Sequence, residues 1–131
     1  MSEQLLSVED RLIESLAAAS GGPRQNALYA LWLLVRTCGG LLPPDALSGR
    51  THRGRVAGLE RRLRLLSLPS PLRRALAGSV RELGEGTPHA AAIALQQLVA
   101  PARETVGADA GEALAAAART ARDVSRETRG G

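Results

Sequence analysis

Apolar residues recur at spacings of three and four along most of this chain, and this spacing constrains the fold more than any other feature of the sequence. Side chains three or four positions apart lie on one face of an α-helix, whereas a half-buried strand needs alternating apolar and polar residues. The sequence contains no sustained alternation of β-branched or aromatic residues. It therefore predicts an all-α fold, a compact bundle of five or six short helices.

Glycine and proline divide the chain into these helices, because glycine ends helices readily and proline is tolerated in their first turn but not in their interior. A loop is expected over 41–51, which contains Pro43 and Pro44. The expected helices span residues 8–19, 24–37, 55–66, 72–83 and 88–100, the last with a kink at Pro101, and a sixth helix starts near Asp109.

Four polar side chains are placed to cap the starts of helices. Ser7 precedes the first apolar stripe. Ser70 and Thr87 each precede a proline, so a hydroxyl acceptor is followed by a residue that needs no backbone donor. Asp109, with Glu112 three positions later, resembles a capping box.

The length of 131 residues fits one domain with one hydrophobic core. We expect a single helical domain over 1–131, with a tail that frays from about residue 125. The segment 27–35 is apolar nearly all round and is expected to form a central helix. The expected core consists of Leu12, Leu16, Leu28, Leu31, Trp32, Leu34, Val35, Leu59, Leu63, Leu76, Val80, Leu95, Leu98 and Leu114.

Cysteine usage and hydropathy favour a cytoplasmic protein without a transmembrane segment. Cys38 is the only cysteine, so no internal disulfide can form, and a reducing compartment suits the chain. The first ten residues are acidic and lack the basic and apolar regions of a secretory signal. The longest apolar run, 27–35, is about half the length that a membrane span needs.

Residues that commonly carry catalysis are few. The histidines are His52 and His89, and neither lies in a cluster with metal-ligand spacing. Cys38, at the end of an apolar helix, is typical of a small core residue. The acidic pair Glu9 and Asp10 is expected on a solvated helix surface. Because no phosphate-binding loop or nucleophile motif is present, we predict no enzymatic activity, no cofactor and no metal.

Positive charge is concentrated in the middle of the chain. All 17 basic residues are arginine, a bias typical of GC-rich genomes, so the positions of the arginines are more informative than their number. Residues 50–74 hold eight arginines and one acid, Glu60, a net charge of +7, whereas 1–49 and 75–131 carry −2 and −1. The candidate contacts to phosphates or to an acidic partner are Arg50, Arg53, Arg55, Arg61, Arg62, Arg64, Arg73 and Arg74.

A second candidate surface follows from heptad spacing near the carboxyl end of the chain. The stripe combines alanines and leucines, so two helices can approach closely as an antiparallel hairpin or against another subunit. Packing on the chain's own core is the simpler explanation of the same stripe. The seam residues are Ala91, Leu95, Leu98, Ala102, Ala110, Leu114, Ala117 and Ala121.

Two hypotheses about function follow. The leading one is a non-enzymatic helical binding or assembly subunit, which docks on a protein partner or self-associates through the hairpin over 88–124. The alternative is a nucleic-acid-binding protein or ribonucleoprotein subunit that contacts phosphates through the arginines of 50–74. The only aromatic residues, Tyr29 and Trp32, fall in the apolar second helix, so the sequence offers no stacking platform for single strands.

Overall fold

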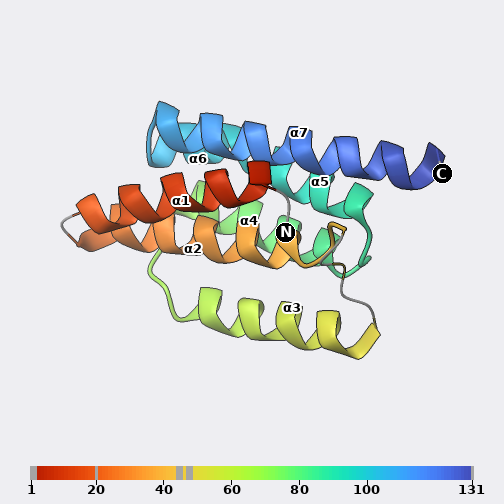
Figure 1. The fold of residues 1–131 in the computed structure, drawn as a ribbon. Coiled ribbons are helices and arrows are strands. Elements are labelled where there is room, and N and C mark those ends of the chain that lie inside the picture. Colours follow the sequence, from red (N-terminus) through yellow and green to blue (C-terminus); the bar gives the residue numbers. More distant parts are fainter. Residues whose placement is uncertain (1–2, 20, 44–45, 47–48, 131) are drawn as a thin grey trace.

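The computed structural model describes residues 3–19, 21–43, 46 and 49–130, which form seven helices and their connections without strands (Figure 1). This confirms the prediction of a compact all-α fold. The helices are α1 (Glu3–Ala18), α2 (Gly22–Gly39), α3 (Gly49–Arg64), α4 (Ser70–Leu83), α5 (Pro88–Gln96), α6 (Val99–Thr105) and α7 (Ala108–Gly130).

Helix α2 is the centre of the fold, because it contacts each of the other six helices. Its run of apolar residues has no solvent-facing side over most of its length, so Leu28, Leu31 and Leu34 are fully buried. Cys38 is also fully buried, and burial raises the pKa of its thiol far above the usual value. The prediction of a central second helix with Cys38 as a core residue is confirmed.

The carboxyl-terminal part of the chain forms an antiparallel hairpin, in which α7 runs back along α6 and α5 and also packs on α1 (Figure 1). Gly111 permits the close approach of α6 and α7, because a Cβ atom there would lie 3.0 Å from the Cβ of Arg103. Gly107, with φ of 140°, provides the backbone conformation at the turn between these helices. The predicted hairpin is therefore confirmed.

The predicted core agrees closely with the observed one. All fourteen predicted residues are buried except Leu16, Trp32 and Leu63, which are partly buried and pack against the core. Leu41 and Leu42 fall in the predicted loop but are 2% and 0% exposed. Both leucines are part of the hydrophobic core.

Four helices begin earlier than predicted, α2 and α4 by two residues and α1 and α3 by more than one turn. Helix α1 starts at Glu3, so Ser7 lies inside the helix and does not cap it; the buried Leu5 extends the apolar stripe by one turn. Helix α3 starts at Gly49, so the last three residues of the predicted loop are helical. Within that loop, Pro43 lies in an exposed turn and Pro44 is outside the described residues.

One of the other three predicted caps is confirmed. The Thr87 side chain accepts a hydrogen bond from the Ala90 N–H at 3.1 Å. Pro69, not Ser70, is the N-cap of α4, and the Ser70 hydroxyl instead accepts a hydrogen bond from Arg73 at 3.2 Å. Asp109 lies one residue inside α7, where its carboxylate faces the positive end of the helix dipole.

The predicted fifth helix is divided into α5 and α6 by a break at Gln97 and Leu98. Pro101 lies inside α6, not at the kink as expected. Proline has no N–H and its ring clashes with the carbonyl four residues earlier, which here belongs to Gln97. The distortion caused by Pro101 therefore falls one turn upstream of the proline itself.

The break also removes the usual helical donor of the Ala94 carbonyl. In an unbroken helix the Leu98 N–H would bond the Ala94 oxygen, but it bonds the Leu95 oxygen at 3.1 Å. The Ser79 hydroxyl of α4, which is fully buried, donates to the Ala94 oxygen at 2.8 Å. Ser79 thus supplies the bond that the break removes.

The end of the chain remains helical in the described residues. Helix α7 continues to Gly130, past the point near residue 125 at which we expected fraying, and the side chain of Ser125 is buried. Among the described residues no helix combines the length and the hydropathy that crossing a bilayer requires.

We predict that Ser79→Ala lowers the free energy of unfolding by about 1–3 kcal/mol, because the buried Ala94 carbonyl loses its donor. Chemical denaturation followed by circular dichroism measures the change. Ser70→Ala is the matched control, since that hydroxyl is exposed, and should cost less than about 0.5 kcal/mol. Equal losses in the two variants would contradict this account of the α5–α6 break.

Candidate functional site

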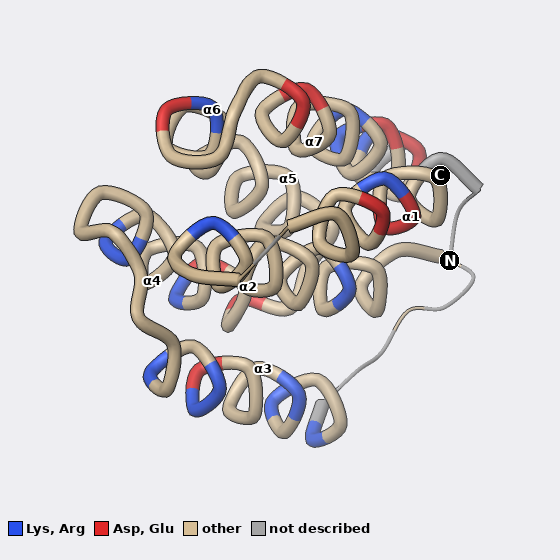
Figure 2. Tube along the Cα trace, turned by 90° about the vertical axis from the view of Figure 1, so that its left-hand side faces the viewer, with Lys and Arg blue, Asp and Glu red and all other residues tan. Residues whose placement is uncertain are grey.

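The candidate arginines lie on α3 and α4, which carry most of the basic segments on this side of the molecule (Figure 2). All eight side chains are exposed. They do not form one face, because consecutive positions on a helix point about 100° apart. Arg64 and Arg73 line a groove between α3 and α4, and Arg55 and Arg62 line a hollow between α2 and α3. The remaining four, Arg50, Arg53, Arg61 and Arg74, line neither.

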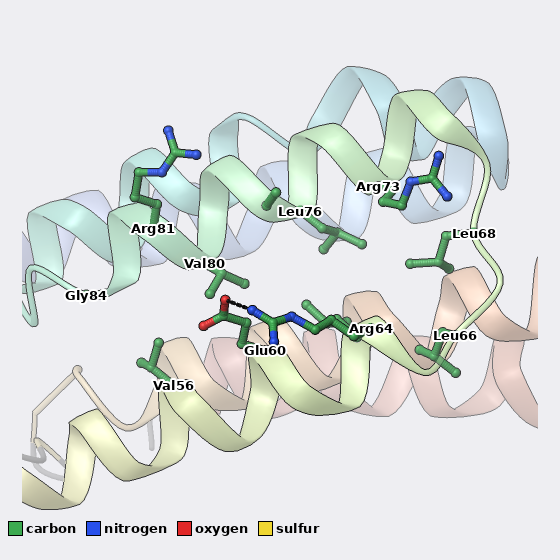
Figure 3. A pocket seen from close by; sticks show the side chains of 12 residues that line it. Val56, Glu60, Arg64, Leu66, Leu68, Arg73, Leu76, Val80, Arg81 and Gly84 are labelled. Carbon is green, nitrogen blue, oxygen red and sulfur yellow. Dashed lines mark hydrogen bonds and ion pairs between the residues drawn. The ribbon is translucent and has the colours of Figure 1, made fainter.

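The groove between α3 and α4 has a volume of about 650 Å³ and a largely apolar floor. In Figure 3, Leu76 and Val80 point from α4 toward α3, with Val56 on the opposite wall and Leu66 and Leu68 at one end. We call this feature the α3–α4 groove. Its lining residues are Val56, Glu60, Leu63, Arg64, Leu66, Leu68, Arg73, Leu76, Ala77, Val80, Arg81 and Gly84.

The groove exists because α3 stands apart from the main bundle and packs chiefly on α2 and α4 (Figure 1). Leu59 is buried, but Val56, Leu63 and Leu66 on the same apolar stripe are only partly buried. The apolar stripe of α3 is therefore wider than the surface that covers it. Its uncovered edge is the floor of the groove.

The rim of the groove is basic. On α3, Arg64 and Glu60 form an i,i+4 ion pair at 2.8 Å, with 72% and 50% of their side chains exposed. On α4, the guanidinium groups of Arg73 and Arg81 lie along the outer edge of the helix (Figure 3). Three arginines and one acid thus border the groove, a net charge of +2 beside apolar surface.

His52 joins the first turn of α3 to the end of α4. Its side chain is 5% exposed, and Nε2 lies 2.7 Å from the Leu83 oxygen. Since a carbonyl only accepts hydrogen bonds, Nε2 carries the proton in this contact. The other ring nitrogen, Nδ1, is buried without a hydrogen-bond partner. His52 lies one turn before Val56, so this bond holds α3 near one end of the groove.

The hollow between α2 and α3 is smaller, about 260 Å³, and its only charged lining residues are arginines. We call it the α2–α3 hollow. Arg36 extends over the ring of Trp32, with 5.5 Å between its guanidinium carbon and the ring centroid. The lining residues are Leu33, Arg36, Thr37, Arg55, Gly58, Leu59 and Arg62.

Glu9 is buried, contrary to the expectation of a solvated acidic pair. The side chain is 4% exposed and its Oε1 has no hydrogen-bond partner. Burial raises the pKa of this carboxyl above 4.5, the charge of Arg36 opposes that rise, and Asp10 adds to it. The indole Nε1 of Trp32 is also buried without a partner. Glu9 lies four positions after Leu5 and three before Leu12, so it shares the buried face of α1 with them.

The seam residues of the carboxyl-terminal hairpin lie inside this chain. All eight are buried within the fold, where α7 packs on α5 and α6. Their small side chains allow that close packing, as expected of the stripe. Because these surfaces are occupied by the chain itself, they offer no free face to a second subunit.

The described residues contain no group of three or more histidine, cysteine, aspartate or glutamate side chains that could hold a metal ion. Comparison of the chain with protein-family models, with curated proteins and with solved structures finds no match. The groove and the hollow are therefore the features of this structure on which a proposal about function rests.

Sequence reasoning missed two arginines that border these features. They are Arg36, in the last turn of α2, and Arg81, in the last turn of α4. Neither lies in the basic segment 50–74, and only the packing of α3 against α2 and α4 brings them to it. A helical-wheel comparison between helices cannot reveal this without knowing which helices are neighbours.

We predict that Glu9→Gln stabilises the protein more at neutral pH than below pH 4. Because the native pKa of Glu9 is raised, the native state keeps its proton when the unfolded chain has lost it, so stability falls as pH rises through that window. The glutamine variant lacks this loss. Thermal unfolding of both proteins from pH 3.5 to 7.5 tests it, with Glu14→Gln, the same substitution at an exposed position of α1, as control; a gain independent of pH would contradict the prediction.

We also predict that His52→Ala loosens α3 selectively. The variant removes the hydrogen bond to the Leu83 oxygen, so amides of α3 should exchange with deuterium faster while those of α5 and α7 keep their protection. Hydrogen-exchange mass spectrometry measures this. His89→Ala, at an exposed histidine, should leave the pattern unchanged. Uniform acceleration over all helices would show that His52 has no local role.

Proposed function

We propose that this protein is a non-enzymatic docking subunit that binds an acidic amphipathic helix of a protein partner in the α3–α4 groove. The observation that carries the proposal is an apolar floor bordered by three arginines and one acid. Recognition of amphipathic helices by grooves depends on this combination of an apolar contact stripe and flanking charges.

The dimensions of the groove suit a short helix. Its α4 wall runs from Arg73 to Gly84, eleven residue steps of about 1.5 Å, or about 17 Å in all. Three turns of a bound helix cover that length and present apolar residues at i, i+3, i+4 and i+7. Leu65, between the groove residues Arg64 and Leu66 in sequence, is an apolar side chain that is 85% exposed.

The charge of the rim favours an acidic partner. Arg73 and Arg81 on α4 and Arg64 on α3 are exposed and border both sides of the apolar floor. Carboxylates that flank the apolar stripe of a partner helix meet these guanidinium groups, which donate bidentate hydrogen bonds to them. A basic helix would meet repulsion on both sides, so the rim supplies specificity as well as attraction.

The nucleic-acid alternative receives less support. Its candidate contacts point in several directions around α3 and α4. Two of them, Arg64 and Arg73, flank an apolar floor of leucine and valine, and contacts to phosphates need no apolar surface. Tyr29 and Trp32 are both partly buried and pack edge to face at 6.1 Å. These rings offer no open platform on which bases could stack.

A labelled synthetic peptide of about 15 residues, with leucines at helical spacing and flanking glutamates, tests the proposal by fluorescence anisotropy. We predict that it binds at least tenfold more tightly than the same peptide with lysines. Ala77→Trp fills the groove from the exposed surface of α4 and should abolish binding. Arg73→Glu with Arg81→Glu should weaken binding at least tenfold.

The matched control is Arg53→Glu with Arg74→Glu, which makes the same change of charge on α3 and α4 outside the groove. It should change affinity less than threefold. Circular dichroism of each variant checks the fold. Equal affinity for the two peptides, or binding that survives Ala77→Trp, would contradict the proposal. Salt-steep binding of duplex DNA that is lost equally in both double variants would favour the nucleic-acid alternative.

A further inference from the structure

We infer that the α2–α3 hollow is a binding site for a small phosphoryl anion of the pyrophosphate class. It is separate from the α3–α4 groove and lies on the other edge of α3, so the inference does not depend on the docking function. Three arginines from two helices border the hollow: Arg36 from α2, and Arg55 and Arg62 from α3.

The spacing on α3 brings two of these arginines to one side of the helix. Arg55, Gly58, Leu59 and Arg62 follow one another at three, one and three positions, so all four face α2. Gly58 lies between the two arginines, and a Cβ atom at this position would have only the Arg61 Nη2 within 4.0 Å. Because glycine carries no side chain, the space between the guanidinium groups stays open.

The α2 side supplies a preorganised guanidinium. Arg36 stacks on Trp32, whose ring also contacts Tyr29 edge to face, and this limits the freedom of a long side chain. Thr37 lies next to Arg36 and lines the hollow, although its hydroxyl donates to the Leu33 oxygen at 2.9 Å. Less conformational entropy is therefore lost when Arg36 contacts an anion.

No acid among the lining residues neutralises this charge. Glu9 interacts electrostatically with Arg36, but its carboxyl is buried and does not line the hollow. Glu60, the acid on α3, borders the other edge of the helix and pairs with Arg64. Three positive charges therefore surround a hollow with leucine on its walls, where a multivalent anion is attracted more strongly than in open water.

The chemistry of the donors selects the ligand class. Guanidinium groups present paired N–H donors that match the oxygens of phosphoryl groups. Three such groups around about 260 Å³ suit an anion with two linked phosphoryl groups, and the volume is less than half that of the α3–α4 groove. The same chemistry occurs in a nucleic-acid backbone, so the experiment must separate the two sources.

Trp32 is the only tryptophan, and Arg36 stacks on it, so ligand binding at Arg36 should change its fluorescence. Pyrophosphate is titrated at constant ionic strength, with isothermal calorimetry as a second readout. A saturable one-to-one response is expected. Arg55→Gln with Arg62→Gln should weaken the affinity at least tenfold, and Arg53→Gln with Arg74→Gln, the same loss of charge outside the hollow, less than threefold.

A second pair of variants tests the open space itself. Gly58→Leu fills the gap between the arginines and should weaken pyrophosphate binding at least tenfold. Gly54→Leu, at an exposed α3 glycine outside the hollow with no heavy atom within 4 Å of an added Cβ, should not. Circular dichroism checks that both variants fold, since leucine is a better helix former than glycine.

Three results would overturn the inference. One is the absence of calorimetric binding at millimolar pyrophosphate. Another is equal weakening in the two double-arginine variants, which would show attraction by net charge only. The third is binding of duplex DNA or RNA through the hollow arginines without competition by pyrophosphate, which would assign these residues to a nucleic-acid surface. Loss of acidic-peptide binding in Ala77→Trp has no bearing on these outcomes.

Discussion

The burial of α2 on nearly all sides is the constraint on which the rest of the structure depends. Because this helix contacts the six others, each of them must present an apolar stripe toward the same axis. The first turn of α2 is exposed, and near its other end Arg36 is exposed and Thr37 is partly buried, although Cys38 and Gly39 after them are buried. The hollow beside α3 is formed where Arg36 and Thr37 reach the surface.

The alanine-rich hairpin packs closely but contributes few of the large buried side chains. Alanine seams allow α7 to pack closely on α5 and α6, but each alanine buries little apolar area, at about 25 cal/mol per Å². The leucines of α1, α2 and α4 supply most of the large buried side chains instead. When these leucines pack around α2, helix α3 forms an outer layer that covers only part of α2 and α4.

The sequence was sufficient for the fold class, the order of the helices and most of the core, because these depend on local spacing. The Thr87 cap was also predictable from two adjacent residues. The break near Gln97 was displaced from its cause, Pro101, by one turn of helix. The role of Ser79 could not be predicted from the sequence. Its hydroxyl donates to the Ala94 carbonyl, which lacks a helical donor only because of the break.

The candidate sites were less predictable, because they depend on which helices become neighbours. The arginine-rich segment looked like one surface, but Arg61, Arg62 and Arg64 point to different sides of α3: Arg62 borders the hollow, Arg64 borders the groove, and Arg61 borders neither. Reversing all three charges together would therefore disturb two separate features at once. Arginines that are adjacent in the sequence point in different directions around a helix. The two edges of α3 therefore carry separate sets of arginines, and each edge forms a different candidate site.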